Sequence, residues 1–94
     1  MAVFNIGETV ICSVEIRNSA GTLVDPSTSM QIKINQLSPI FLNTLVATSM
    51  TPDSTGKYHY DFVSTNKTTG NYQIIYVATD GTRVTIKKEN FSLE

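Results

Sequence analysis

The sequence predicts an all-β fold, in which residues 1–92 form a single antiparallel β-sandwich of about seven strands. Two observations support this prediction. Apolar and polar residues alternate along most segments, which is the period of a half-buried strand. Turn-forming residues recur about every 8–12 positions, the spacing typical of a sandwich, and no segment shows helical periodicity. At 94 residues the chain is long enough for one domain with a modest core.

Glycine and proline divide the first half of the chain into predicted strands. Gly7 turns a short strand into a long one, and Pro39 breaks the chain before a strand with a weaker pattern. The clearest alternation predicts that Met30, Ile32 and Ile34 point inward. The predicted strands of this half are, in order, Phe4–Ile6, Thr9–Arg17, Leu23–Val24, Ser29–Asn35 and Phe41–Thr48.

Two segments of the second half open with a Gly-x-Tyr triplet that follows a turn. Gly56 and Gly70 permit these turns, because glycine adopts backbone conformations that other residues resist. Tyr58 and Tyr72 then each begin an alternating pattern. We expect Phe91 to pack at the end of the last strand or just beyond it. The predicted strands of this half are Lys57–Ser64, Asn71–Thr79 and Thr82–Lys88.

The register of the final hairpin decides which side chains of its last strand are buried. A two-residue turn at Asp80-Gly81 would mix apolar and charged residues on one face. A three-residue loop at 79–81 shifts the pairing by one and gives a continuous apolar face. Because burial favours that face, we predict the three-residue loop. It pairs Tyr76 with Val84 and Ile74 with Ile86, and its core residues are Tyr72, Ile74, Tyr76, Val84 and Ile86.

This register also predicts a partner-contact patch on the outside of the hairpin. Two adjacent aliphatic side chains would project outward there, beside cationic residues of the neighbouring strand. Such a surface suits a neighbouring domain or subunit. The predicted patch consists of Ile75, Val77, Arg83, Thr85 and Lys87.

Composition argues against two classes of partner. The chain has 7 Lys and Arg against 8 Asp and Glu, without the basic surplus of a nucleic-acid-binding protein. No apolar run approaches the roughly 20 residues of a membrane-spanning helix, so membrane insertion is not expected. The N-terminal residues lack the basic and apolar regions of a signal peptide. Leu93 and Glu94 are interpreted as a candidate cloning remnant without structural weight.

Cys12 is the single cysteine, so an intrachain disulfide is excluded. It shares one face of a predicted strand with Val10 and Val14, and a free cysteine on such a face is usually a small buried apolar residue. A nucleophilic role would require a nearby base and a depressed pKa, and nothing cationic flanks it. We expect Cys12 to be buried and unreactive.

The order of turns and strand starts resembles that of immunoglobulin-like β-sandwich modules. These modules occur in bacterial and archaeal surface proteins, macroglobulin-like chains and phage virion proteins. The resemblance implies an Ig-like sandwich in which Tyr72 occupies the tyrosine corner, with a buried ring and a hydroxyl bonded to the backbone. The chain lacks the cysteine pair and tryptophan of antibody domains. The segments that carry the resemblance are Gly7-Glu8-Thr9-Val10, Gly21-Thr22-Leu23-Val24-Asp25-Pro26, Asp53-Ser54-Thr55-Gly56-Lys57-Tyr58, Gly70-Asn71-Tyr72 and Asp80-Gly81-Thr82.

The residues suited to catalysis or metal binding form no recognisable motif. His59 and Asp61 share one strand face and can supply two metal ligands, whereas a zinc site needs three or four. The turn aspartates Asp25, Asp53 and Asp80 are expected to bond their own backbone, and no calcium-loop pattern is present. Nucleophile-elbow and phosphate-loop motifs are also absent from the sequence. We therefore predict no enzyme activity, no cofactor and no metal.

The leading functional prediction is a non-catalytic structural or interaction module. It would act as a spacer, display or assembly domain at a cell surface or in a virion. Its partners would be neighbouring domains of the same polypeptide, other surface or virion proteins, or further copies of itself. The alternative is carbohydrate binding, which requires exposed aromatic rings and for which Phe41 is the best loop-adjacent candidate. A small hydrolase or metal-binding domain is the third reading, and the sequons at Asn66 and Asn90 are attributed to chance.

Overall fold

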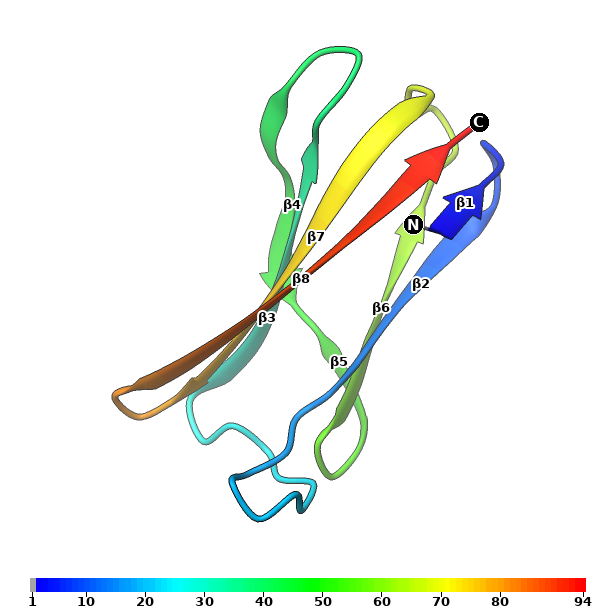
Figure 1. Cartoon of the computed structure of the whole chain (residues 1–94). Helices are drawn as coiled ribbons and strands as arrows, with labels where there is room; N and C mark the ends of the chain where they lie inside the picture. Colours follow the sequence, from blue (N-terminus) through cyan, green and yellow to red (C-terminus); the bar gives the residue numbers. More distant parts are fainter. Residues whose placement is uncertain (1) are drawn as a thin grey trace.

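The computed structural model describes residues 2–94, which form an all-β sandwich of two sheets (Figure 1). One sheet has the strand order β1-β8-β7-β3-β4 and the other has the order β2-β6-β5. All named strands pair antiparallel except β1 and β8, which pair parallel. The strands are β1 (Ala2–Phe4), β2 (Thr9–Glu15), β3 (Ser29–Gln36), β4 (Leu42–Ser49), β5 (Thr51–Ser54), β6 (Lys57–Val63), β7 (Gly70–Asp80) and β8 (Arg83–Leu93).

The core lies between the sheets and follows the alternation of the sequence. Met30, Ile32 and Ile34 of β3 are buried, as predicted, and Cys12 is buried on β2. An aromatic cluster fills one end of the core, where the Tyr72 and Phe91 rings stack with centroids 5.2 Å apart. The other large buried side chains are Val10, Val14, Met50, Tyr58, Phe62, Ile74, Tyr76 and Leu93.

Three segments differ from the predicted strands. The first strand is β1 at Ala2–Phe4, which shares only Phe4 with the predicted strand Phe4–Ile6. Leu23 forms only an isolated bridge with Arg17, so Leu23–Val24 is not a strand. Strand β5 was not predicted, because Pro52 and its polar neighbours have the composition of a turn. It lies at the sheet edge and pairs with β6 through an irregularity after Pro52. No helix within residues 2–94 has the length and apolar character needed to cross a membrane.

The predicted register of the final hairpin is wrong. The turn residues are Gly81 and Thr82, and Asp80 pairs with Arg83. Tyr72, Ile74 and Tyr76 are buried as predicted, whereas Val84 and Ile86 are 57% and 56% exposed. In the observed register Tyr76 lies opposite Lys87 and Ile74 lies opposite Glu89.

Phe91 and Leu93 account for this register. Both are buried at the end of β8, opposite Tyr72 and Gly70. The β7–β8 ladder runs without a bulge, so every second residue of β8 faces the core side. Burying Phe91 and Leu93 therefore turns Val84 and Ile86 outward. The structure thus includes Leu93 in the core, although the sequence interpretation gave it no structural weight.

The two sheets diverge beside the first part of β8. Thr85, Lys87 and Glu89 share the core-side face with Phe91, yet all three are exposed. Open grooves separate this part of β8 from β2, with Glu15 and Lys87 lining two of them. Polar side chains are tolerated on this face because water reaches it.

Candidate contact surfaces

The two candidate metal ligands of the sequence, His59 and Asp61, lie on the outside of the three-stranded sheet. His59 Nδ1 lies 2.6 Å from Asp53 Oδ1 on the outside of the three-stranded sheet, in a partly exposed pair. Asp61 is exposed. Within residues 2–94, no group of three or more His, Cys, Asp or Glu side chains lies close enough to hold a metal ion.

The turn aspartates do not bond their own backbone, contrary to the expectation. Asp25 Oδ1 accepts hydrogen bonds from Gly56 N at 2.7 Å and from the Tyr58 hydroxyl at 2.9 Å. These bonds, the Gly56 amide first, lower the pKa of the Asp25 carboxyl. Asp80 accepts from the backbone and hydroxyl of Ser27, and those bonds lower its pKa as well. The aspartates therefore tie separate loops together.

Cys12 behaves as a buried structural residue. Its Sγ donates weakly to the Val10 carbonyl oxygen at 3.7 Å. Burial, and secondarily the carboxylates of Glu89 and Asp61, raises the pKa of the thiol to about 12. A thiol with so high a pKa is a poor nucleophile at neutral pH.

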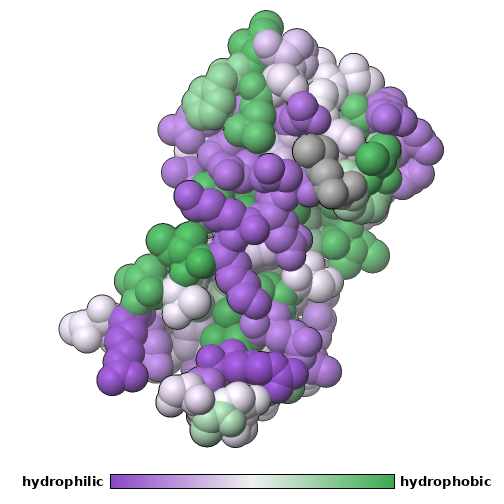
Figure 2. All heavy atoms as spheres, viewed as in Figure 1, coloured by the Kyte–Doolittle hydropathy of each residue, from purple (hydrophilic) through white to green (hydrophobic). Residues whose placement is uncertain are grey.

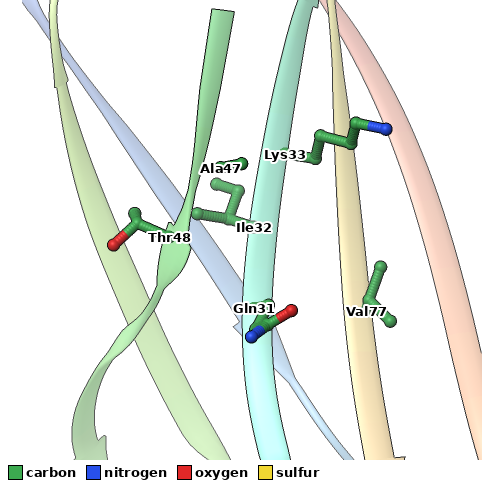
Figure 3. Close-up of a pocket in the computed structure, with 6 residues that line it drawn as sticks. All are labelled: Gln31, Ile32, Lys33, Ala47, Thr48 and Val77. Atoms are coloured by element: carbon green, nitrogen blue, oxygen red, sulfur yellow. The ribbon is translucent and has the colours of Figure 1, made fainter. Parts of the chain in front are cut away.

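The outer face of the five-stranded sheet carries a shallow hollow of about 260 Å³ over β3, β4 and β7 (Figure 3). Figure 3 shows Lys33 extending from β3 toward β7, with Val77 on β7 and Ala47 on β4 nearby. Its lining contains one cation and no carboxylate, histidine or cysteine. The hollow therefore offers neither an acid–base pair nor a nucleophile with a base.

The hairpin tip between β3 and β4 has the most exposed run of apolar side chains. We define the tip as Ile40, Phe41 and Leu42, which are 68%, 62% and 45% exposed. The loop extends beyond the rest of the sandwich at the top of Figure 1. In the same view, Figure 2 shows hydrophobic side chains at that end of the molecule. Exposure of adjacent large apolar residues marks a candidate contact surface.

Buried polar side chains hold the base of the tip. Gln36 is buried and its Nε2 donates to the Ile40 carbonyl oxygen at 3.0 Å. Asn35 is also buried, and its Oδ1 accepts from Thr44 N at 2.7 Å. Thr44 has a left-handed backbone with φ of 58°, which few non-glycine residues adopt. The loop conformation is therefore fixed by side-chain amides that replace the strand ladder.

The start of β7 braces the same loop from the other side. Leu37 N donates to the Asn71 carbonyl oxygen at 2.7 Å, and Asn71 N donates to Ser38 Oγ at 3.1 Å. Gly70 lies so close that an added Cβ would overlap the Ser38 carbonyl oxygen, and its φ of 149° also favours glycine. The tip is thus a rigid element whose apolar side chains point to solvent.

The predicted contact patch is divided between two faces of the hairpin. Ile75 and Val77 lie on the outer face, partly buried, opposite Lys88 and Ile86. Arg83, Thr85 and Lys87 lie on the core-side face. The five residues do not form one surface, because the observed register reverses the faces of β8.

The outer face instead carries an aliphatic stripe made of Ile75, Val77, Val84 and Ile86. Ile86 lies directly opposite Val77. Lys33 of β3 and Lys88 of β8 lie opposite Ile75 on either side, and Ile75 is partly buried. Figure 2 shows hydrophobic side chains over the lower part of β7 and β8. Sequence alternation identified Ile75 and Val77, whereas Val84 and Ile86 were assigned to the core.

Comparisons with known proteins identify no relative of this chain: no family model, curated protein or solved structure gives a significant match.

Proposed function

We propose that this domain is a non-catalytic structural and interaction module that contacts a partner protein through the tip. The observation that carries the proposal is that buried side-chain amides hold the base of the tip while the apolar side chains of the tip itself are exposed. Gln36 and Asn35 fix the loop, while Phe41 and its neighbours remain in water. A contact element that is already ordered loses little conformational entropy when it binds.

We also propose that the sandwich is immunoglobulin-like. One sheet has the strand order β8-β7-β3-β4, which corresponds to strands G-F-C-C′ of the immunoglobulin topology. The other has the order β2-β6-β5, which corresponds to strands B-E-D. Tyr72 supports the assignment, because its ring is fully buried and its hydroxyl donates to the Thr68 carbonyl oxygen. A spacer, display or assembly role at a cell surface or in a virion follows by analogy with such modules.

Protein is favoured over carbohydrate as the partner of the tip. Sugar-binding surfaces stack the rings of their ligand on exposed aromatic side chains, and among residues 2–94 Phe41, 62% exposed, is the one Phe or Tyr that is not at least partly buried. Its neighbours Ile40 and Leu42 are aliphatic and suit an apolar protein surface.

Site-specific photo-crosslinking tests the proposal. A benzophenone amino acid replaces Phe41 in the natural full-length polypeptide within its source cells or particles. The matched control carries the same probe at the exposed Ser19, in the loop between β2 and β3. Figure 1 shows that loop at the end of the domain opposite the tip. We expect a discrete protein adduct at position 41 and none at position 19. Adducts on carbohydrate alone, equal labelling at both positions or no adduct would contradict the proposal.

A further inference from the structure

Strand β8 has a long open edge. The short strand β1 pairs with Phe91, Ser92 and Leu93, and β7 occupies the opposite side of β8 along its whole length. No strand within residues 2–94 covers the remaining edge at residues 83–90. An uncovered edge presents unpaired backbone groups that can extend the sheet with another strand.

The alternation of the backbone shows which residues offer these groups. Glu94 N donates to the Phe4 carbonyl oxygen at 2.8 Å, and Ile6 N donates to the Glu94 carbonyl oxygen at 2.9 Å. The backbone of Glu94 therefore faces the β1 side. Successive residues of a strand alternate in direction, so Val84, Ile86 and Lys88 face the same open edge.

From these observations we propose that β8 pairs antiparallel with β8 of a second copy, about a two-fold axis at Ile86. An antiparallel pair of identical strands has this symmetry and gives a closed dimer. Ile86 would pair with its own counterpart, and Val84 would pair with Lys88 of the other copy. These pairs would exchange about six backbone hydrogen bonds.

Charge favours this register over the two neighbouring ones, centred on Thr85 and on Lys87. On the core-side face it places Arg83 opposite Glu89 of the other copy, twice by symmetry, and Thr85 opposite Lys87. Centring the pair on Thr85 would instead set Arg83 against Lys87, and centring it on Lys87 would set two lysines together. Like charges directly opposite are destabilising, whereas opposite charges stabilise cross-strand pairs.

The same register joins the aliphatic stripes of the two copies. Val77 lies opposite Ile86 within one copy, so the row across the dimer would read Val77, Ile86, Ile86, Val77. Four β-branched side chains would then adjoin on one outer face, which favours cross-strand packing. Charged side chains on edge strands normally prevent two edges from pairing. In this register each charged side chain of β8 lies opposite an oppositely charged or neutral residue of the other copy.

Sedimentation velocity over a range of protein concentrations tests the proposal. We expect the wild-type chain to form dimers that weaken as salt increases. Arg83→Glu and Glu89→Arg should each weaken dimerisation at least about tenfold, because each sets like charges together. The double variant should restore it, and Asp61→Lys, a charge change on the exposed side of the other sheet, should leave it unchanged.

Ile86→Pro provides an independent arm. Proline lacks the amide hydrogen and is tolerated where that group faces the open edge, so this variant should stay folded and become monomeric. Circular dichroism and urea unfolding verify its fold. A monomeric wild type, or a double variant as weak as either single one, would overturn the proposal. The tip is remote from this edge, so failure here leaves the crosslinking result at Phe41 unaffected.

Discussion

The two ends of β8 belong to one unbroken strand but lie in different surroundings. Phe91 and Leu93 are buried between β1, β7 and the opposite sheet, and Phe91 stacks on Tyr72. Val84 and Ile86, at the other end, are more than half exposed although they are equally apolar. In a strand without a bulge, the same alternate residues face the core along the whole length of the strand. The end that buries the larger apolar area therefore determines which residues those are.

The largest loss of stability should come from removing the Phe91 side chain, whose burial determines which residues of β8 face the core. Phe91→Ala should lower the free energy of unfolding by about 3–5 kcal/mol, because it leaves a cavity in the aromatic cluster. Ile86→Ala is the matched control and should change stability by about 0.5 kcal/mol or less. Urea denaturation measures both, at a protein concentration at which sedimentation velocity shows the chain to be monomeric. Equal losses would show that the exposed end contributes to the core as much as the buried end.

The partner of Phe91 should show a smaller effect. Tyr72→Phe keeps the stacked ring but removes the hydroxyl that donates to Thr68, and we expect a loss of about 1–2 kcal/mol. Tyr60→Phe, at a partly exposed tyrosine of the other sheet, is the control. If Tyr72→Phe were neutral in the same denaturation experiment, the tyrosine corner would contribute nothing to stability.

The fold class and most of the core were predictable from sequence because they depend on local alternation. Met30, Ile32 and Ile34 face inward for that reason, and Tyr72 was placed correctly from its turn. The faces of β8 depend on Phe91, nine residues beyond the observed turn at Gly81-Thr82, whereas the prediction was based on a loop at 79–81. Local pairing near a turn could not reveal which end of the strand would be covered.

The candidate site was less predictable for a related reason. Phe41 was expected near a loop, and it is exposed there. The predicted strand ended at Asn35 and left Gln36 outside it, and only the folded loop shows both amides to be buried. The aspartates were assigned to local turns, whereas Asp25 bonds to the distant Gly56 and Tyr58. These contacts join residues that are far apart in sequence.

The smallest effect concerns Glu89, which lies at the boundary between the two ends of β8. Burial raises the pKa of Cys12 to about 12 from an unperturbed 9.0, and the Glu89 carboxylate adds to this shift. A raised pKa means that the folded chain keeps a proton which the unfolded chain releases first. Stability associated with Cys12 is therefore complete below about pH 9 and declines as pH rises toward 12.

Thiol labelling of the native protein checks this account of Cys12. We expect labelling far slower than in the urea-unfolded chain, and slightly faster in Glu89→Gln than in the wild type. Glu15→Gln is the control, because Glu15 contributes nothing to the shift of the Cys12 pKa. Rapid labelling of the native wild type would place Cys12 outside the core.

The register of β7 and β8 is the central claim, and nuclear Overhauser effects between α-protons measure it directly. The backbone of Ile86 faces away from β7, so Val77 and Ile86 form a close pair with α-carbons about 4.5 Å apart. We predict strong α-proton contacts between Val77 and Ile86 and between Ile75 and Lys88. Contacts between Tyr76 and Val84 would contradict the account, because they require Val84 to share the buried face with Tyr76.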